Sequence, residues 1–148
     1  MSNLWFIYAI SASIMWGVGY VLSERILKQY GVAPSFLLVL QGLFTFTAYA
    51  TVSWFLGTFK PGFAALFQNK AVFPSILLMV ALIVGGNYLI YLSVSLKNAT
   101  LSSVIESTYP LFTFVFAWLF FREMQLNLAT GTGALLIMIG VIIIYLKS

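Results

Sequence analysis

The sequence predicts an all-α integral membrane protein with five transmembrane helices. Hydrophobic residues make up 62% of its 148 residues and charged residues only 7%, whereas a soluble domain carries about 25% charged residues. The mean hydropathy is +1.06. Charged residues separate apolar runs that are each long enough to cross a hydrocarbon core about 30 Å thick. A water-soluble fold of this composition would have too few polar residues to cover its surface.

These runs give the expected positions of the five helices. They are about 5–22, 35–56, 74–95, 99–121 and 126–146. The first run follows a start without Lys or Arg and is longer than the roughly 7–15 apolar residues of a signal peptide, which is the rival interpretation. The fourth run contains one charged residue, Glu106. We therefore expect a single multi-pass membrane domain over residues 1–148.

The longest loop, residues 57–73, has a helical pattern of its own. Its apolar residues around Lys60 and Pro61 fall at helical spacing: Phe59, Phe63, Leu66 and Phe67. Proline suits the first turn of a helix, and this spacing places the apolar side chains on one helix face. The pattern predicts a short helix, either in the membrane interface or as a plain connector.

The composition also excludes several classes of function. The chain has no His, Cys or Asp, so the usual metal sites and the Ser-His-Asp and Cys-His arrangements are absent. The seven basic residues are scattered singly, whereas a nucleic-acid site needs a basic patch. We expect no metal, no cofactor and no nucleic acid. An intramembrane enzyme would have only Glu106, lysines and hydroxyl groups to work with.

The basic residues are balanced across the membrane. With five spans, three of the seven lie on the side of the N-terminus and four on the other: Lys60, Lys70 and Arg122 against Arg25, Lys28, Lys97 and Lys147. The α-amino group makes this four against four. Because the positive-inside rule needs an asymmetry to fix orientation, the balance predicts dual topology, with copies inserted both ways and paired antiparallel. The alternative is that other signals fix one orientation.

Polar residues recur at three- or four-residue spacing inside the spans. The stripes are Ser13, Trp16, Tyr20 and Ser23; Gln41, Thr45, Tyr49 and Ser53; Asn87, Tyr91 and Ser95; and Ser102, Ser103, Glu106, Tyr109, Pro110 and Thr113. Such spacing puts each set on one side of its helix. Hydrogen bonds between helices explain most membrane Ser and Thr residues, but the amides of Gln41 and Asn87 are costlier to bury.

Glu106 is the strongest site candidate. An ionisable residue within a span is costly without partners and marks a functional site by default. Pro110 lacks the N–H that would donate to the carbonyl of Glu106, so a helix kink at Pro110 and a freed carbonyl coincide with the carboxyl group. The fifth span instead carries Gly131, Gly133 and Gly140 among Leu, Ile and Val. Small residues allow close helix approach, which predicts a packing or dimer helix.

Taken together, the chain resembles the EamA family of the drug/metabolite transporter superfamily. The matching residues are Trp16-Gly17, Pro110, Arg122-Glu123 and the stretch from Gly133 to Val141. The resemblance covers the whole chain as one five-helix repeat. Because family members commonly carry two copies, the second inverted, it implies one half of an inverted-repeat transporter in the inner membrane of the cell.

The resemblance does not account for Glu106. Relatives with four spans work as antiparallel dimers built on a glutamate in their first helix, and the first span here has none. We expect Glu24, which lies at the end of that span, to be an interfacial ion partner of Arg25. Glu123 matches the loop acid of the family, and we expect a structural role for it.

The leading hypothesis is a secondary transporter of small metabolites or of drug-like or cationic solutes, acting as an antiparallel homodimer in the lipid bilayer and coupled to protons. The residues expected to bind solute or proton are Trp16, Tyr20, Asn87, Tyr91, Glu106 and Tyr109. The alternative is a non-transporting membrane subunit or half-transporter that pairs with a different protein. This alternative predicts one fixed orientation and no solute flux from the purified chain.

Overall fold

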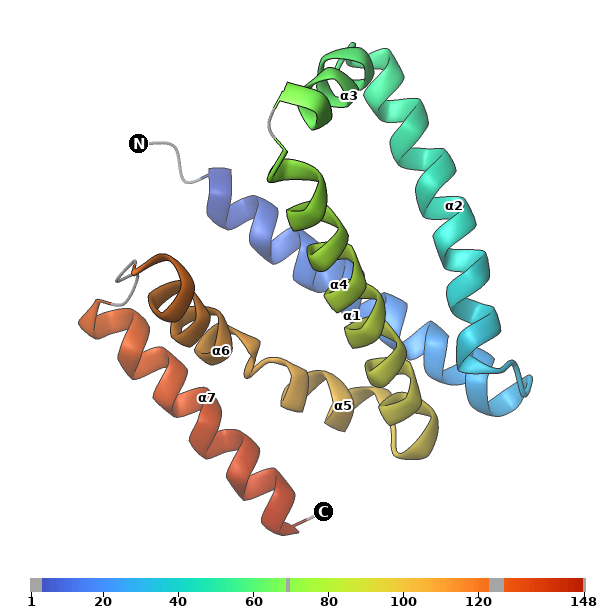
Figure 1. The fold of residues 1–148 in the computed structure, drawn as a ribbon. Coiled ribbons are helices and arrows are strands. Elements are labelled where there is room, and N and C mark those ends of the chain that lie inside the picture. Colours follow the sequence, from blue (N-terminus) through green and yellow to red (C-terminus); the bar gives the residue numbers. More distant parts are fainter. Residues whose placement is uncertain (1–3, 69, 123–126, 148) are drawn as a thin grey trace. The chain divides into compact units, whose positions relative to one another are not determined.

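The computed structural model describes residues 4–68, 70–122 and 127–147, and the secondary structure that it assigns there is helical throughout (Figure 1). Within the described residues, five stretches are long and apolar enough to cross a membrane: Leu4–Gln29, Pro34–Phe55, Val72–Leu96, Ala99–Phe121 and Leu128–Lys147. The predicted fold class, an all-α membrane protein with five spans, is confirmed. Glu123, for which we expected a structural role, lies outside the described residues.

The chain forms two compact parts, and each is described by itself. The first part, here the Glu106 part, contains residues up to Glu24 and those from Leu96 onward. It holds α1 (Leu4–Gln29) as far as Glu24, α5 (Ala99–Glu106), α6 (Tyr109–Phe116), the π-helical turn η1 (Ala117–Phe121) and α7 (Leu128–Lys147). The second part, here the α2–α4 part, runs from Arg25 to Ser95.

The α2–α4 part contains α2 (Pro34–Phe55), α3 (Phe59–Gln68) and most of α4 (Val72–Leu96). Pro34 occupies the first turn of α2, where its missing N–H breaks no helical bond. At the other end Gly57 has a φ of +68°. The N–H groups of Gly57 and Thr58 donate to the carbonyls of Trp54 and Ser53, each at 3.0 Å. This is a Schellman ending, and glycine supplies the left-handed residue that it needs.

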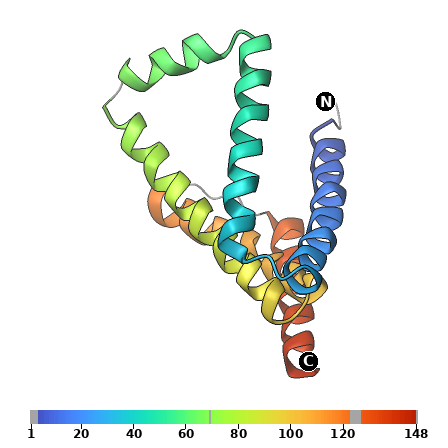
Figure 2. The same ribbon diagram turned by 90° about the vertical axis from the view of Figure 1, so that its right-hand side faces the viewer.

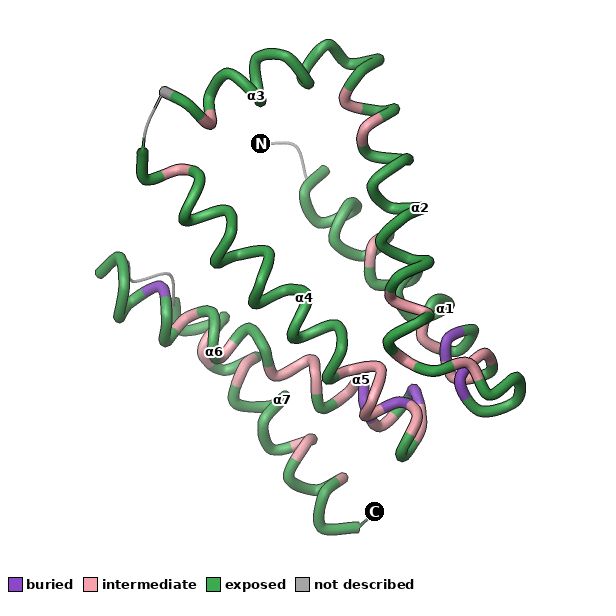
Figure 3. Tube along the Cα trace, turned by 45° about the vertical axis from the view of Figure 1, so that its right-hand side comes forward, coloured by how far each residue is buried: buried purple, intermediate pink, exposed green. Residues whose placement is uncertain are grey.

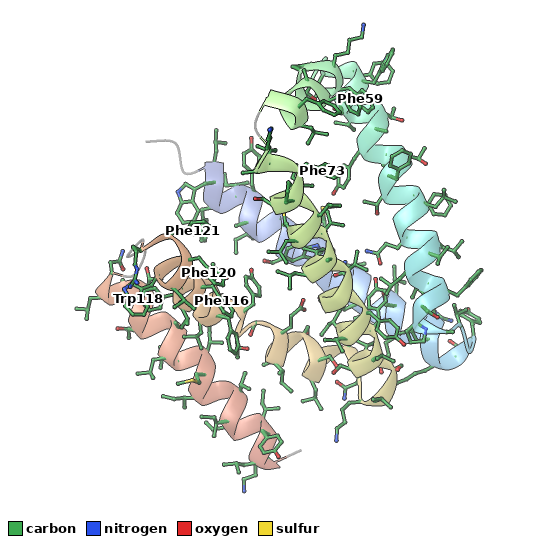
Figure 4. All side chains as sticks on the ribbon, in the orientation of Figure 1. Phe59, Phe73, Phe116, Trp118, Phe120 and Phe121 are labelled. Atoms are coloured by element: carbon green, nitrogen blue, oxygen red, sulfur yellow. The ribbon has the colours of Figure 1, made fainter. Side chains whose placement is uncertain are left out.

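The short helix expected in the long loop is α3, which joins the end of α2 to the start of α4 (Figure 2). Phe63 and Phe67 lie one turn apart with their rings 5.4 Å apart in an edge contact. Phe59 of the same helix lies 6.4 Å from the ring of Trp54. Figure 4 labels Phe59 and Phe73 near the two ends of α3. Aromatic residues are common at the ends of membrane spans, which agrees with a helix that connects two of them.

Most side chains of the protomer are exposed, as Figure 3 shows. Among the described residues the buried apolar ones are Leu27, Val94, Ala99 and Ala117. The long helices instead expose Leu, Ile, Val and Phe side chains along their length. Lipid, or a second protein chain, has to cover such a surface, because water would not solvate it favourably.

Candidate functional site

The fourth span is interrupted in its middle, beside the glutamate that the sequence singles out. α5 ends at Glu106 and α6 begins at Tyr109, with a turn at Ser107 and Thr108. Across this turn the N–H of Ser107 donates to Ser103, and the N–H of Thr108 to Ile105. Pro110 lies in the first turn of α6. It has no N–H to extend the α-helical bonding pattern back to Glu106, which gives the interruption its chemical cause.

The span also ends irregularly. Residues 117–121 form the π-helical turn η1, and Arg122 follows with a left-handed φ of +59°. The guanidinium carbon of Arg122 lies 5.5 Å from the ring centroid of Trp118, a cation–π contact. Figure 4 labels Trp118 among the aromatic residues Phe116, Phe120 and Phe121 of this end. Basic and aromatic residues of this kind are typical of the ends of membrane spans.

Glu106 itself faces α1. The phenol of Tyr20 donates a hydrogen bond to Oε2 of Glu106, and both side chains are partly buried. Inside a membrane span, a carboxyl group needs such a partner, because an unpaired charge there costs several kcal/mol. The residue that supplies it comes from the polar stripe of the first span, so two stripes predicted from separate helices meet at this bond.

A cavity of about 340 Å³ surrounds this pair. It is lined by Ser13, Trp16, Gly17 and Tyr20 of α1, by Ser103, Glu106, Ser107, Tyr109 and Pro110 of the fourth span, and by Ile137 of α7. The structure thus brings five of the predicted positions to one cavity: Trp16, Tyr20, Glu106, Tyr109 and Pro110. Glu106 carries the one formal charge among the lining residues, which gives the cavity an acidic character.

The serines of this cavity are bonded to their own helices. Ser13 donates to the carbonyl of Ala9 at 3.0 Å, Ser103 to that of Thr100 at 3.0 Å, and Ser107 to that of Val104 at 2.6 Å. This back-bonding is the common behaviour of helical serines. The hydroxyl protons of these serines are therefore engaged within their own helices, whereas the Tyr20–Glu106 bond joins two helices across the cavity.

A second contact ties α1 to α5 one helical turn further along α1. Oε2 of Glu24 accepts a hydrogen bond of 2.8 Å from the backbone N–H of Ala99, the first residue of α5. The expected partner of Glu24 was Arg25, but Nε of Arg25 donates to Oε1 of Gln29 at 2.8 Å within α1. Glu24 therefore caps a neighbouring helix.

Asn87 and Tyr91 lie on α4, in the α2–α4 part. There the phenol of Tyr91 donates to Oε1 of Gln41 on α2 at 2.6 Å. Gln41 and Tyr91 both belong to the predicted polar stripes, so this bond joins two stripes within the second part. Asn87 is exposed in the protomer.

A second, apolar cavity of about 540 Å³ lies between α6 and α7. It shares Tyr109, Pro110 and Ile137 with the acidic cavity, and it is also lined by Leu111, Thr113, Phe114, Thr130, Gly133 and Ala134. A Cβ atom placed at Gly133 or at Gly140 would meet nothing within 4 Å. Gly131 lies in the same helix and is partly buried. Gly133 lines this cavity, and both Gly133 and Gly140 leave room for a larger side chain within the chain.

Sequence reasoning did not place Gly17, Ser107 and Ile137 in the site. Ser107 lies in the turn that interrupts the span, and the proline three residues later was a signal that could have marked this turn. Ile137 is one of many similar apolar residues on α7, so the sequence carried no signal for it.

The comparisons with known proteins agree with this architecture. The model of the EamA-like transporter family matches residues 3–146, nearly the whole chain. Searches of curated proteins and of solved structures gave no match. The family match and the five apolar spans make the chain a multi-pass membrane protein of transporter type. With the all-helical fold and the extent of the match, the chain is a member of the EamA-like transporter family.

Proposed function

We propose that the chain is a secondary transporter of small cationic solutes, which bind at Glu106 and exchange there with a proton. The observation that carries this proposal is the single carboxylate in the acidic cavity, held by the Tyr20 phenol and surrounded by aromatic side chains. A metal or a covalent intermediate is not needed. The family assignment supports transport in general, and the cavity supports the class of solute.

The chemistry of the cavity favours a cation with an apolar body. Glu106 supplies the charge, and Trp16, Tyr20 and Tyr109 line the same cavity. Aromatic faces attract cations, most strongly where water is excluded, and quaternary ammonium groups are bound in this way. The adjoining apolar cavity, which shares Tyr109, offers room for further apolar groups of the solute.

Proton exchange follows from the position of Glu106 within a span. A bare carboxylate in this position is costly, whereas a protonated carboxyl group or a carboxylate paired with a cation is compensated. The solute and the proton therefore compete for the same oxygen atoms. Such competition couples the movement of the solute to the opposite movement of the proton, provided that the solute site opens alternately to the two sides of the membrane.

The transporter is proposed to be an antiparallel homodimer in the inner membrane. The balance of basic residues gives no preferred orientation under the positive-inside rule. Transporters built from inverted repeats bind solutes at the repeat interface, and a second copy inserted the other way up would supply the missing repeat. A Cβ atom at Gly133 or Gly140 would meet nothing within 4 Å, and such unfilled small-residue positions suit a helix that packs against another chain. Asn87 and Tyr91 of α4 complete the proposed set of solute-contacting residues.

Transport assays on the purified chain in proteoliposomes test this proposal. Radiolabelled tetramethylammonium is the probe, because it carries a permanent charge and cannot cross as a neutral base. We expect uptake when the lumen is acidic, and loss of this uptake in Glu106→Gln, which keeps the size of the side chain. Glu106→Gln with unchanged pH-driven uptake would contradict the coupling role. No uptake from any preparation, together with one fixed orientation, would favour the non-transporting subunit.

A further inference from the structure

The Tyr20–Glu106 hydrogen bond ties α1 to the end of α5, and a second hydrogen bond ties α1 to its start. The second is the bond from the Ala99 N–H to the Glu24 carboxylate. Tyr20 meets the last residue of α5, and Glu24 meets its first residue. The two helices therefore run antiparallel along this contact, and α5 is held at both of its ends.

Helix geometry shows that both contacts lie on one face of α1 and on one face of α5. Tyr20 and Glu24 are four residues apart, which places them on one side of α1 about 6 Å apart along the axis. Ala99 and Glu106 are seven residues apart, two turns or about 10.5 Å along α5. Ser102, which lies between them on that face, is 2% exposed and Ala99 is 2% exposed, while Ser23 of α1 is 8% exposed. The faces are thus closely packed at the Glu24 end.

α5 is too short to hold its own position. It has 8 residues, and isolated helices of this length are not stable. Its N-terminal N–H groups need acceptors, and two side chains supply them. Oδ1 of Asn98 accepts from the N–H of Leu101 at 2.7 Å, which is a local cap. Glu24 accepts from the N–H of Ala99, and it is the cap that comes from a different helix.

We propose that Glu24 is a positioning residue for the solute site: its carboxylate fixes α5 against α1 in the one register that brings Glu106 to the Tyr20 phenol. An ionised carboxylate at a helix N-terminus forms a charge-assisted hydrogen bond and is favoured by the helix dipole. Without it, the buried N–H of Ala99 loses its acceptor, and a buried donor without a partner is costly. α5 then shifts or frays, and Glu106 leaves Tyr20.

The effect of Glu24 on the Tyr20–Glu106 hydrogen bond can be measured without any solute. In a sample brought to a pH low enough to protonate Glu106, its carboxyl group gives an infrared C=O band, which is assigned by its loss in Glu106→Gln; the chain has only three acidic side chains. Tyr20→Phe removes the phenol, so the band should move to higher wavenumber as the hydrogen bond is lost. We expect Glu24→Ala to move the same band in the same direction. Glu24→Gln keeps an oxygen acceptor and should leave the band near its wild-type position.

The matched control is Arg25→Ala, which removes a neighbouring side chain whose hydrogen bond to Gln29 stays within α1. The band should not move in this variant. If Glu24→Ala does not yield folded protein, Glu24→Asp takes its place, because the shorter carboxylate is withdrawn from Ala99. A Glu106 band that stays in place in Glu24→Ala, or one that Tyr20→Phe does not move either, would overturn the inference.

Binding of tetramethylammonium gives a second test, which rests on the proposed function. We expect Glu24→Ala to weaken binding about tenfold, a coupling typical of residues in one hydrogen-bond network. In a Tyr20→Phe background the same change should have little further effect, because the bond that it supports is already gone. Full additivity of the two substitutions would mean that Glu24 only stabilises the fold. If Glu106→Gln binds the probe normally while Glu24→Ala still moves the band, the proposed function fails and the positioning role stands.

Discussion

The phenol of Tyr20 donates a hydrogen bond to the carboxylate of Glu106, a residue that is 86 positions further along the chain. The bond joins the first span to the fourth exactly where the fourth is interrupted. It places the carboxylate of Glu106 in a cavity that is lined by aromatic side chains.

Tyr20→Phe tests the hydrogen bond directly. The substitution removes one hydroxyl group and keeps the ring, so the packing of α1 is preserved. A hydrogen bond to a charged group contributes about 1.5–3 kcal/mol. We therefore expect tetramethylammonium transport to slow by roughly tenfold and its pH dependence to change. Proteoliposome uptake measured across a range of pH values checks this.

Tyr8→Phe is the control for that substitution. Tyr8 lies on the same helix and is 68% exposed, and the chemical change is identical. Its pH profile should match that of the unmodified chain. Equal profiles for Tyr20→Phe and Tyr8→Phe would show that the Tyr20 phenol does not act on the site.

Pro110→Ala tests the interruption between α5 and α6. Alanine restores an N–H that can donate to the carbonyl of Glu106, so the span can become a continuous helix. We expect stability to rise by about 1 kcal/mol from the added hydrogen bond and transport to fall roughly tenfold or more, because Glu106 and Tyr109 change their relative positions. Thermal unfolding and uptake are measured on the same preparation. Pro34→Ala, in the first turn of α2, should change neither by a comparable amount.

Asn98→Ala tests the local cap of α5. Oδ1 of Asn98 accepts from the N–H of Leu101, and loss of such a cap costs about 1 kcal/mol. We expect a lower midpoint of unfolding in denaturant, with Asn98→Asp close to the unmodified chain because aspartate caps equally well. An unchanged midpoint in Asn98→Ala would mean that the cap contributes nothing to stability.

The apolar runs and the polar stripes made the fold and part of the site predictable. Runs bounded by charges gave the five spans, because crossing a bilayer imposes length and composition together. Trp16 and Tyr20 followed from one stripe and Glu106 and Tyr109 from another, and the structure brings all four to one cavity. Periodicity identifies the polar face of a helix, and polar faces within a membrane turn toward protein.

The role of Glu24 was out of reach of the same reasoning. Arg25 is its neighbour in sequence, and a local ion pair was the natural expectation. The acceptor of Ala99 comes from 75 positions away, and a single sequence does not record which helix end lies beside which side chain. The turn at Ser107 and Thr108 was only partly predictable, since Pro110 indicates a kink but not whether the helix bends or breaks.

Gly133→Leu tests the dimer helix. A Cβ atom at this position would meet nothing within 4 Å in the protomer, and leucine favours helix more than glycine does. We expect protomer folding to be unaffected and self-association to weaken, because the close approach that glycine permits is lost. Subunit counting by single-molecule photobleaching in bilayers measures this. Gly42→Leu on α2, where a Cβ is equally free, is the control, and equal association of the two variants would remove Gly133 from the interface.

The orientation of the chain decides whether that dimer is antiparallel. The chain has no cysteine, so Tyr30→Cys and Thr58→Cys each introduce a single thiol. Tyr30 precedes the span α2 and Thr58 follows it. The two thiols are therefore expected on opposite sides of the membrane. Because basic residues are balanced between the two sides, we expect an impermeant maleimide to label about half of each variant in intact cells. Permeabilised cells should label fully and serve as the reference. Complete labelling of one position and complete protection of the other would rule out the antiparallel homodimer, since every copy would then face the same way and the inverted repeat would have to come from a different protein.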